Sequence, residues 1–134
     1  MRTLLRTALA LTLLAPSAAG AASELRFTLV AQVPVFCRIS ATEMPITLTD
    51  GKADIGPVHE ICNTQNGYDV TARFSNVDRG VLDVAGMRYR IDQSGVATRG
   101  SDHADVRTSA WRVADAHVVT PELPVIMRVT ISPR

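Results

Sequence analysis

The sequence predicts an all-β protein, a β-sandwich closed by one disulfide. Apolar and polar residues alternate through most segments after residue 22, which is the period of a strand with one buried face. No segment after residue 22 repeats its apolar residues at the helical period of about 3.6 over three turns. The chain has two cysteines, Cys37 and Cys62. Roughly seven or eight short strands separated by turn signals favour two packed sheets.

Composition allows one small domain and excludes several classes of function. The chain has 134 residues, of which 14 are basic and 13 acidic. This length is too short for a multidomain enzyme. The charge balance offers neither the basic surface of a nucleic-acid-binding protein nor the excess charge of a disordered tail. We therefore expect a folded domain with no nucleic-acid partner.

Residues 1–22 have the pattern of a secretory signal peptide. Arg2 and Arg6 give a positive start, an apolar run follows, and a proline and small residues lead to Ala22. A transmembrane anchor would need about 20 consecutive apolar residues, roughly twice the length of this run. We expect cleavage after Ala21 or Ala22, export of the remaining chain, and no transmembrane segment in it.

In an exported domain, Cys37 and Cys62 are expected to form a disulfide. Closing a loop of about 25 residues would stabilise the fold by roughly 3.5 kcal/mol in the chain-entropy model. Two cysteines make a poor zinc site, and a catalytic thiol pair more often has C-x-x-C spacing. The sequence therefore predicts a structural bridge, with no metal and no cofactor.

The first strand-like segment covers residues 25–39. Its odd positions are apolar or cysteine: Leu25, Phe27, Leu29, Ala31, Val33, Val35, Cys37 and Ile39. At about 3.3 Å per residue it would be roughly 50 Å long, which exceeds an ordinary strand. Because Pro34 has no N–H for a ladder bond, we expect it to divide the segment into strands at 25–33 and 35–40.

The remaining strands are expected to be short and separated by turns. The first contains Ile46 and Leu48 and ends at the Asp50-Gly51 turn. The others are expected at 57–63, 68–75, 81–84, 87–92, 110–113, 117–119 and 125–131. Ala85-Gly86 is expected to join a hairpin. Residues 93–107 are polar and show no period, so the sequence predicts a loop there.

No set of residues indicates an active site. The chain has no G-x-S-x-G, H-E-x-x-H or phosphate-binding glycine motif. The acidic and histidine residues of 102–105 lie in the predicted loop, where such side chains are usually solvated. His59 and Glu60 are neighbours in a predicted strand and should point to opposite faces. Trp111 is expected to pack in the core, although an exposed indole could stack on a sugar. We expect that the protein is not an enzyme.

Three stretches of the sequence resemble the spore coat protein U-type domain, a family related to subunits of archaic chaperone–usher pili. They are FTLVAQVPVFCRISAT, VHEICNTQNGYDVTARFS and MRYRID. Trp111 follows the third stretch, as a tryptophan often does in that family. The resemblance covers most of residues 25–131.

This resemblance implies an immunoglobulin-like sandwich that lacks its last strand and has an apolar groove in its place. A periplasmic pilus chaperone fills the groove first, and the N-terminal extension of the neighbouring subunit fills it during assembly at an outer-membrane usher. The extension would be residues 23–34 and the sandwich residues 35–134. The inserted side chains would be Leu25, Phe27, Leu29, Ala31 and Val33. The groove would be lined partly by Val125, Met127, Val129 and Ile131.

Two functions remain open on the sequence. The first is a structural subunit of a pilus or cell-surface fibre, with a role in adhesion or biofilm formation, that polymerises by donor-strand exchange. The second is a self-complete secreted sandwich that binds a ligand, such as a glycan, through residues 93–107 and Trp111. A small periplasmic enzyme ranks third, because no nucleophile and base stand at a recognisable spacing.

Overall fold

The computed structural model describes residues 28–134. Strands connected by turns make up most of this range. These residues contain no helix, and accordingly none of them forms a helix long and apolar enough to cross a membrane. The strands are β1 (Cys37–Ile39), β2 (Glu43–Ile46), β3 (Ala53–Cys62), β4 (Tyr68–Phe74), β5 (Val77–Val84), β6 (Met87–Ile91), β7 (Val96–Ser101), β8 (Asp105–Val118) and β9 (Val125–Pro133). The signal peptide predicted at 1–22 lies outside the described residues.

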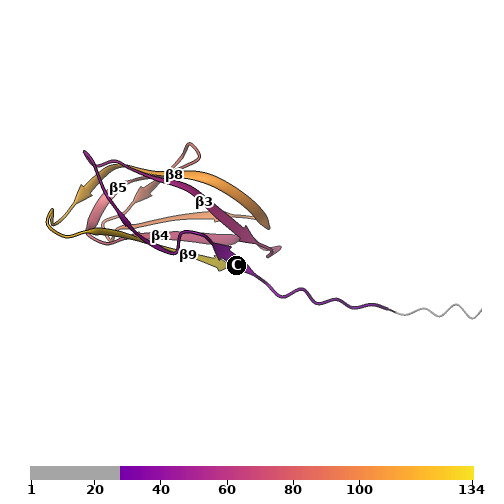
Figure 1. The fold of residues 1–134 in the computed structure, drawn as a ribbon. Coiled ribbons are helices and arrows are strands. Elements are labelled where there is room, and N and C mark those ends of the chain that lie inside the picture. The colour runs from indigo at the N-terminus through magenta and orange to yellow at the C-terminus, as the bar shows by residue number, and fades with distance from the viewer. Residues whose placement is uncertain (1–27) are drawn as a thin grey trace, which may run out of the picture. The chain divides into compact units, whose positions relative to one another are not determined.

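The strands form two antiparallel sheets. Sheet A has five strands in the order β1-β3-β8-β5-β6, and sheet B has four strands in the order β2-β9-β4-β7. Figure 1 shows the two layers, with β3, β5 and β8 in one and β4 and β9 in the other. The predicted all-β sandwich is confirmed. The chain changes sheets between β1 and β2, so these two short strands are the edge strands on one side of the sandwich.

The core lies between the sheets and follows from the alternation in each strand. Tyr68, Val70, Ala72 and Phe74 of β4 all point inward and are buried, as their period of two predicts. Trp111 of β8 is fully buried, and its indole N–H donates a 3.0 Å hydrogen bond to Ser109 Oγ. The prediction of a core tryptophan is therefore confirmed, and its ring offers no face to a sugar.

The predicted disulfide between Cys37 and Cys62 is present. The two residues stand directly opposite each other in the antiparallel pairing of β1 with β3. Since β1 has only three residues, the bridge attaches the start of this strand covalently to a ten-residue partner.

The hairpin predicted at Ala85-Gly86 is also confirmed. Both residues have positive φ, 51° and 87°, which is the two-residue turn that matches the twist of the flanking strands. The turn joins β5 to β6, and the Ala85 N–H donates a 2.9 Å hydrogen bond to the Ala110 carbonyl of β8.

Three predictions of secondary structure are wrong. Residues 93–107 are not a loop, because β7 occupies 96–101 and pairs with β4. The inward positions of β7 are Ala97 and Arg99, so a buried arginine concealed the apolar period. The strands predicted at 110–113 and 117–119 are one strand, β8, which has partners on both edges, β3 and β5.

The third wrong prediction concerns the segment before Cys37. Residues 28–33 form no strand, and residues 25–27 lie outside the described range. The strand predicted at 35–40 is shortened to Cys37–Ile39. A strand needs a neighbour that satisfies its N–H and C=O groups, and among the described residues only β1 acquires one here.

Candidate functional site

The segment ahead of Pro34 carries apolar side chains that are exposed. The exposed fractions are 91% for Leu29, 84% for Val30 and 74% for Val33, and Ala31 is exposed as well. Leu29, Ala31 and Val33, three of the predicted donor side chains, are therefore exposed to solvent and belong to no strand. Leu25 and Phe27 lie outside the described residues. A run of exposed apolar side chains is unfavourable in water and is typical of a segment that binds another surface.

The chain is fixed where it leaves Pro34 and enters β1. The Asn63 side-chain amide donates a 2.8 Å hydrogen bond to the Pro34 carbonyl. Its carbonyl oxygen Oδ1 accepts one of 2.6 Å from the Phe36 N–H, and the Asn63 N–H donates one of 3.1 Å to the Phe36 carbonyl. One asparagine therefore holds the backbone on both sides of Val35, next to the disulfide.

Strand β9 is paired along one edge and only partly along the other. On one side β4 covers it from Met127 to Pro133. On the other side β2 covers only Val125 to Arg128, and the last contact is a 2.8 Å hydrogen bond from the Val129 N–H to the Thr42 carbonyl. Alternate residues of an antiparallel strand direct their backbone groups to the same edge. Ile131 therefore directs its N–H and C=O to the edge that no described strand covers.

A hollow of about 410 Å³ lies beside this uncovered edge. It extends between the last residues of β9 in sheet B and the edge strand β1 of sheet A, and we call it the β1–β9 slot. The side chains and backbone that line it are Cys37, Arg38, Ile39, Ser40, Thr42, Val129, Thr130 and Ile131. Strand β1 pairs only with β3 among the described residues, so the slot has a partly free strand edge on each side.

The structure places two of the four predicted groove residues at this slot. Val129 and Ile131 line it, and Ile131 is half-buried. Val125 and Met127 are instead buried in the core, with exposed fractions of 6% and 0%, and β2 pairs alongside them. The short strand β2 thus occupies the part of the β9 edge where these two residues lie.

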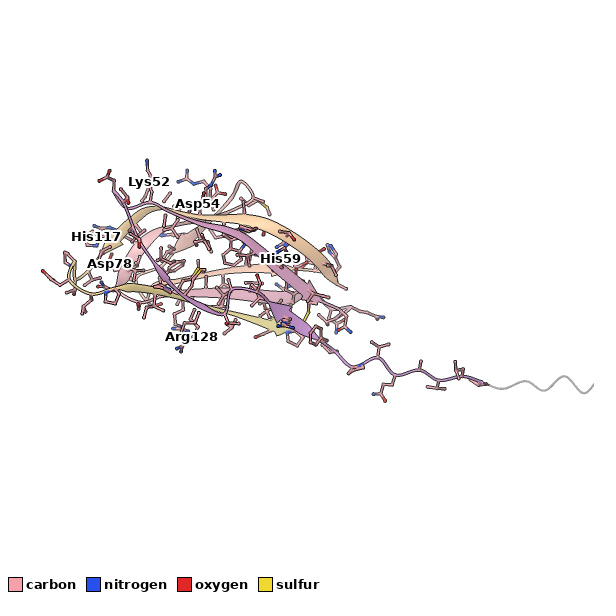
Figure 2. All side chains as sticks on the ribbon, in the orientation of Figure 1. Lys52, Asp54, His59, Asp78, His117 and Arg128 are labelled. Atoms are coloured by element: carbon pink, nitrogen blue, oxygen red, sulfur yellow. A yellow bond between two sulfur atoms is a disulfide. The ribbon has the colours of Figure 1, made fainter. Side chains whose placement is uncertain are left out.

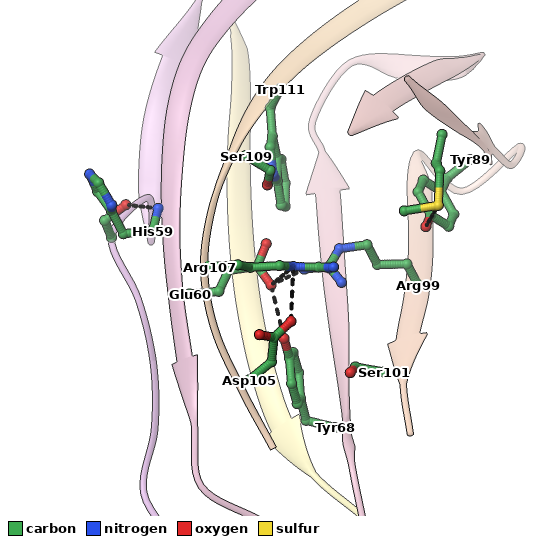
Figure 3. A network of polar contacts seen from close by, with 12 residues as sticks. His59, Glu60, Tyr68, Tyr89, Arg99, Ser101, Asp105, Arg107, Ser109 and Trp111 are labelled. Carbon is green, nitrogen blue, oxygen red and sulfur yellow. Dashed lines mark hydrogen bonds and ion pairs between the residues drawn. The ribbon is translucent and has the colours of Figure 1, made fainter. Parts of the chain in front are cut away.

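A second cluster, which the sequence did not predict, lies in the same end of the sandwich. Glu60 of β3 is buried, and its carboxylate oxygen Oε2 accepts hydrogen bonds from both sheets (Figure 3). The donors are the guanidinium of Arg99 in β7, Nε of Arg107 in β8 at 3.4 Å and the hydroxyl of Tyr68 in β4 at 3.4 Å. Asp105 Oδ2 lies 3.8 Å from Arg107 Nε. We call Glu60, Arg99, Arg107 and Tyr68 the Glu60 network.

Burial governs the titration of Tyr68 in this network. Removal from water raises the pKa of its hydroxyl, the neighbouring Arg107 charge lowers that pKa, and the Asp105 charge raises it. At the surface of the same end, the hydrogen bond from Arg134 lowers the pKa of Asp69.

One signal in the sequence could have revealed Glu60. It has the same parity as Val58 and Cys62 in β3, and all three are buried, so a carboxylate stands on an apolar face. Arg99 and Arg107 gave no such signal, because both fell in the segment predicted as a loop. The prediction that His59 and Glu60 point to opposite faces is confirmed, since His59 is exposed.

The remaining candidates for chemistry do not form a site. His59 Nδ1 lies 2.6 Å from Thr108 Oγ1 and His117 Nδ1 lies 2.8 Å from Asp78 Oδ1, both at the surface (Figure 2). Asp102 is paired with Arg134 at 2.9 Å. Within residues 28–134, no group of three or more His, Cys, Asp and Glu side chains could hold a metal ion.

The fold and the slot define a class of protein, a small two-sheet β-sandwich with one disulfide and an incompletely covered strand edge. Comparisons with protein-family models, with curated proteins and with solved structures found no match. The resemblance to spore coat protein U-type domains therefore depends on the three sequence stretches alone.

Proposed function

We propose that the protein is a secreted structural subunit of a chaperone–usher type pilus or cell-surface fibre that assembles by donor-strand exchange. Residues 25–33 of one subunit would fill the β1–β9 slot of the next. The observation that carries the proposal is an exposed apolar segment and an uncovered strand edge in the same chain. Its partners would be neighbouring subunits, a periplasmic chaperone and an outer-membrane usher.

The two surfaces are complementary in chemistry. An entering strand would pair with the backbone groups that Ile131 directs outward, as in other cases of strand addition. Its alternate side chains would pack against Ile39 and Ile131. Burying an exposed leucine or valine contributes about 1.5–3 kcal/mol, so Leu29 and Val33 supply a large part of the affinity.

The length of the donor segment bears on β2. The uncovered part of β9 starts after Val129 and ends at Pro133, so it is shorter than a donor strand of nine residues. Displacement of β2, which has four residues, would extend the slot along the whole of β9. The proposal then assigns Val125 and Met127 to the groove in the assembled fibre and to the β2-covered core in the free subunit.

Self-association of the chain tests this proposal. We expect residues 23–134 to form concentration-dependent oligomers in size-exclusion chromatography with light scattering. The chain beginning at residue 34 should remain monomeric and bind a peptide of residues 23–33. A monomer at every concentration, with no affinity for the peptide, would contradict the proposal.

A matched pair of substitutions in the segment sharpens the test. Leu29→Asp places a charge on the face that would be buried, and we expect it to weaken association by about 100-fold, because an unpaired carboxylate cannot be desolvated cheaply. Gln32→Asp places the same charge on the opposite face and should change association by less than about threefold. Equal effects of the two substitutions would exclude an inserted strand.

A further inference from the structure

The Glu60 network links strands from both sheets through a single carboxylate oxygen. Glu60 and Arg107 belong to β3 and β8 of sheet A, while Tyr68 and Arg99 belong to β4 and β7 of sheet B. Figure 3 shows Arg99 and Arg107 approaching the carboxylate from opposite sides. The Glu60 and Arg99 side chains are almost completely buried, with exposed fractions of 0% and 3%. At this end of the sandwich the contacts between the sheets are therefore directional charge-assisted bonds.

Stability alone does not account for this arrangement. Four buried polar atoms of the network have no hydrogen-bond partner among the described residues: Glu60 Oε1, Arg99 Nε, Arg99 Nη1 and Arg107 Nη2. A buried polar atom without a protein partner adds nothing to stability and costs free energy wherever water does not reach it. Well-packed apolar side chains of similar volume commonly stabilise a fold at least as well as a buried ion pair. Apolar side chains in these positions would not fix the geometry between the two sheets, because their contacts are not directional.

The network lies one strand away from each side of the β1–β9 slot. On one side, Glu60 stands opposite Ile39 of β1. On the other side, Tyr68 stands opposite Pro133 of β9. Arg99 is connected to β9 by backbone pairing, because Val70 of β4 stands opposite Arg99 on one edge and opposite Ile131 on the other. Of the four strands that the network joins, β3 is thus the immediate neighbour of β1 and β4 is the immediate neighbour of β9.

We propose that Glu60, Arg99 and Arg107 are positioning residues that set the separation of β1 and β9 and so keep the slot open for a strand. This inference depends on the proposed function for what the slot receives. The network itself touches no donor residue and acts through the backbones of β3 and β4. Without it, the apolar side chains at this end would be free to close over the slot.

The test compares three variants of residues 23–134. Glu60→Gln keeps the shape but removes the charge that two guanidinium groups face. Glu60→Leu combined with Arg99→Met fills the same space with apolar groups. Leu82→Ala, in β5, removes buried core volume without removing a polar contact of the network, so it is the control for a general loss of stability.

Hydrogen exchange provides the readout that a merely stabilising role would not change. We expect Glu60→Gln to lower the folding equilibrium constant by about 100-fold or more, because it leaves buried charges unpaired. The two variants are then compared at conditions where their overall stabilities are equal. There, Glu60→Gln should exchange about tenfold faster than Leu82→Ala at the amides that pair β1 with β3 and the last residues of β9 with β4. Equal exchange in the two variants would overturn the inference.

The apolar double variant separates geometry from stability. We expect it to regain the thermal midpoint of the wild-type chain while self-association stays about tenfold weaker. Wild-type association in this variant would overturn the positioning role. If Glu60→Gln does not fold, Arg107→Met replaces it, because the Arg107 side chain is 27% exposed and its loss is milder.

Failure of the proposed function has a different signature. A wild-type chain that does not associate would contradict strand exchange, whereas the exchange comparison between Glu60→Gln and Leu82→Ala would still decide whether the network holds β1 and β9 in place.

Discussion

The two ends of the sandwich interior are filled in different ways. Around Trp111 the two sheets meet through buried apolar side chains, including Leu82 of sheet A and Ala72 of sheet B. Around Glu60 they meet through a carboxylate, two guanidinium groups and a phenol. The first end follows the common rule that apolar area removed from water drives folding. The second end buries less apolar area because polar groups occupy part of its interior. The disulfide and the slot lie at this second end.

This difference indicates that one end mainly stabilises the fold, whereas the other defines the geometry between the sheets. The Trp111 end can hold the fold together without specifying a precise separation of the sheets, since apolar contacts are not directional. The Glu60 end has directional bonds and a covalent bridge, beside a strand edge that the described strands cover only in part. Order at this end therefore comes from specific bonds, next to the part of β9 that β2 does not pair with.

Trp111→Ala should have the largest effect and would break the apolar end. Removing a fully buried indole leaves a cavity, and we expect a loss of about 3–5 kcal/mol in the free energy of unfolding. Urea denaturation followed by circular dichroism measures it. Val106→Ala, on an exposed residue of the same strand, is the control and should stay within about 0.5 kcal/mol of the wild type. A small effect of Trp111→Ala would mean that the apolar end does not dominate stability.

Removal of the disulfide comes next and would weaken the Glu60 end. The bridge spans 25 residues of sequence. Cys37→Ala combined with Cys62→Ala should therefore lower the free energy of unfolding by roughly 3.5 kcal/mol in the chain-entropy model. The check is denaturation of this variant beside the wild-type chain with and without reductant. Reductant should destabilise the wild type and leave the variant unchanged.

The smallest expected effect is an alkaline transition at Tyr68. Burial raises the pKa of Tyr68, so the folded state keeps the hydroxyl proton more tightly than the unfolded state does. The resulting stability is fully present below the unfolded pKa of about 10 and is lost as the pH rises above it. Tyr68→Phe should flatten the fall in thermal midpoint above about pH 10. An unchanged alkaline slope in the variant would show that Tyr68 does not contribute to it.

Much of the sandwich could be predicted because several strands, β4 and β9 among them, have one buried face that is entirely apolar. The inward alternation of β4, the hairpin between β5 and β6 and the disulfide all follow from local spacing and turn chemistry. Strand β7 could not be predicted in this way, because one of its two buried positions is Arg99. Its burial depends on Glu60, which is 39 residues away in sequence.

The sequence could select the exposed apolar segment of the candidate site, but it could locate only part of the slot on β9. Leu29, Ala31 and Val33 were selected by alternation, and all three are exposed in the structure. The predicted groove included Val125 and Met127, but β2 pairs at that part of β9. A four-residue edge strand containing Pro45 has too few residues to show its pairing in the sequence, so the pattern could not reveal which half of β9 is covered.

The position of the disulfide has a mechanical consequence. Cys37 is the first residue of β1, and the described residues just ahead of it are attached through hydrogen bonds with Asn63. A tensile force applied to the N-terminal segment would therefore pass through a covalent bond into Cys62 at the end of β3. That load would then be shared by the long ladder between β3 and β8, so the three-residue strand β1 would not have to resist peeling.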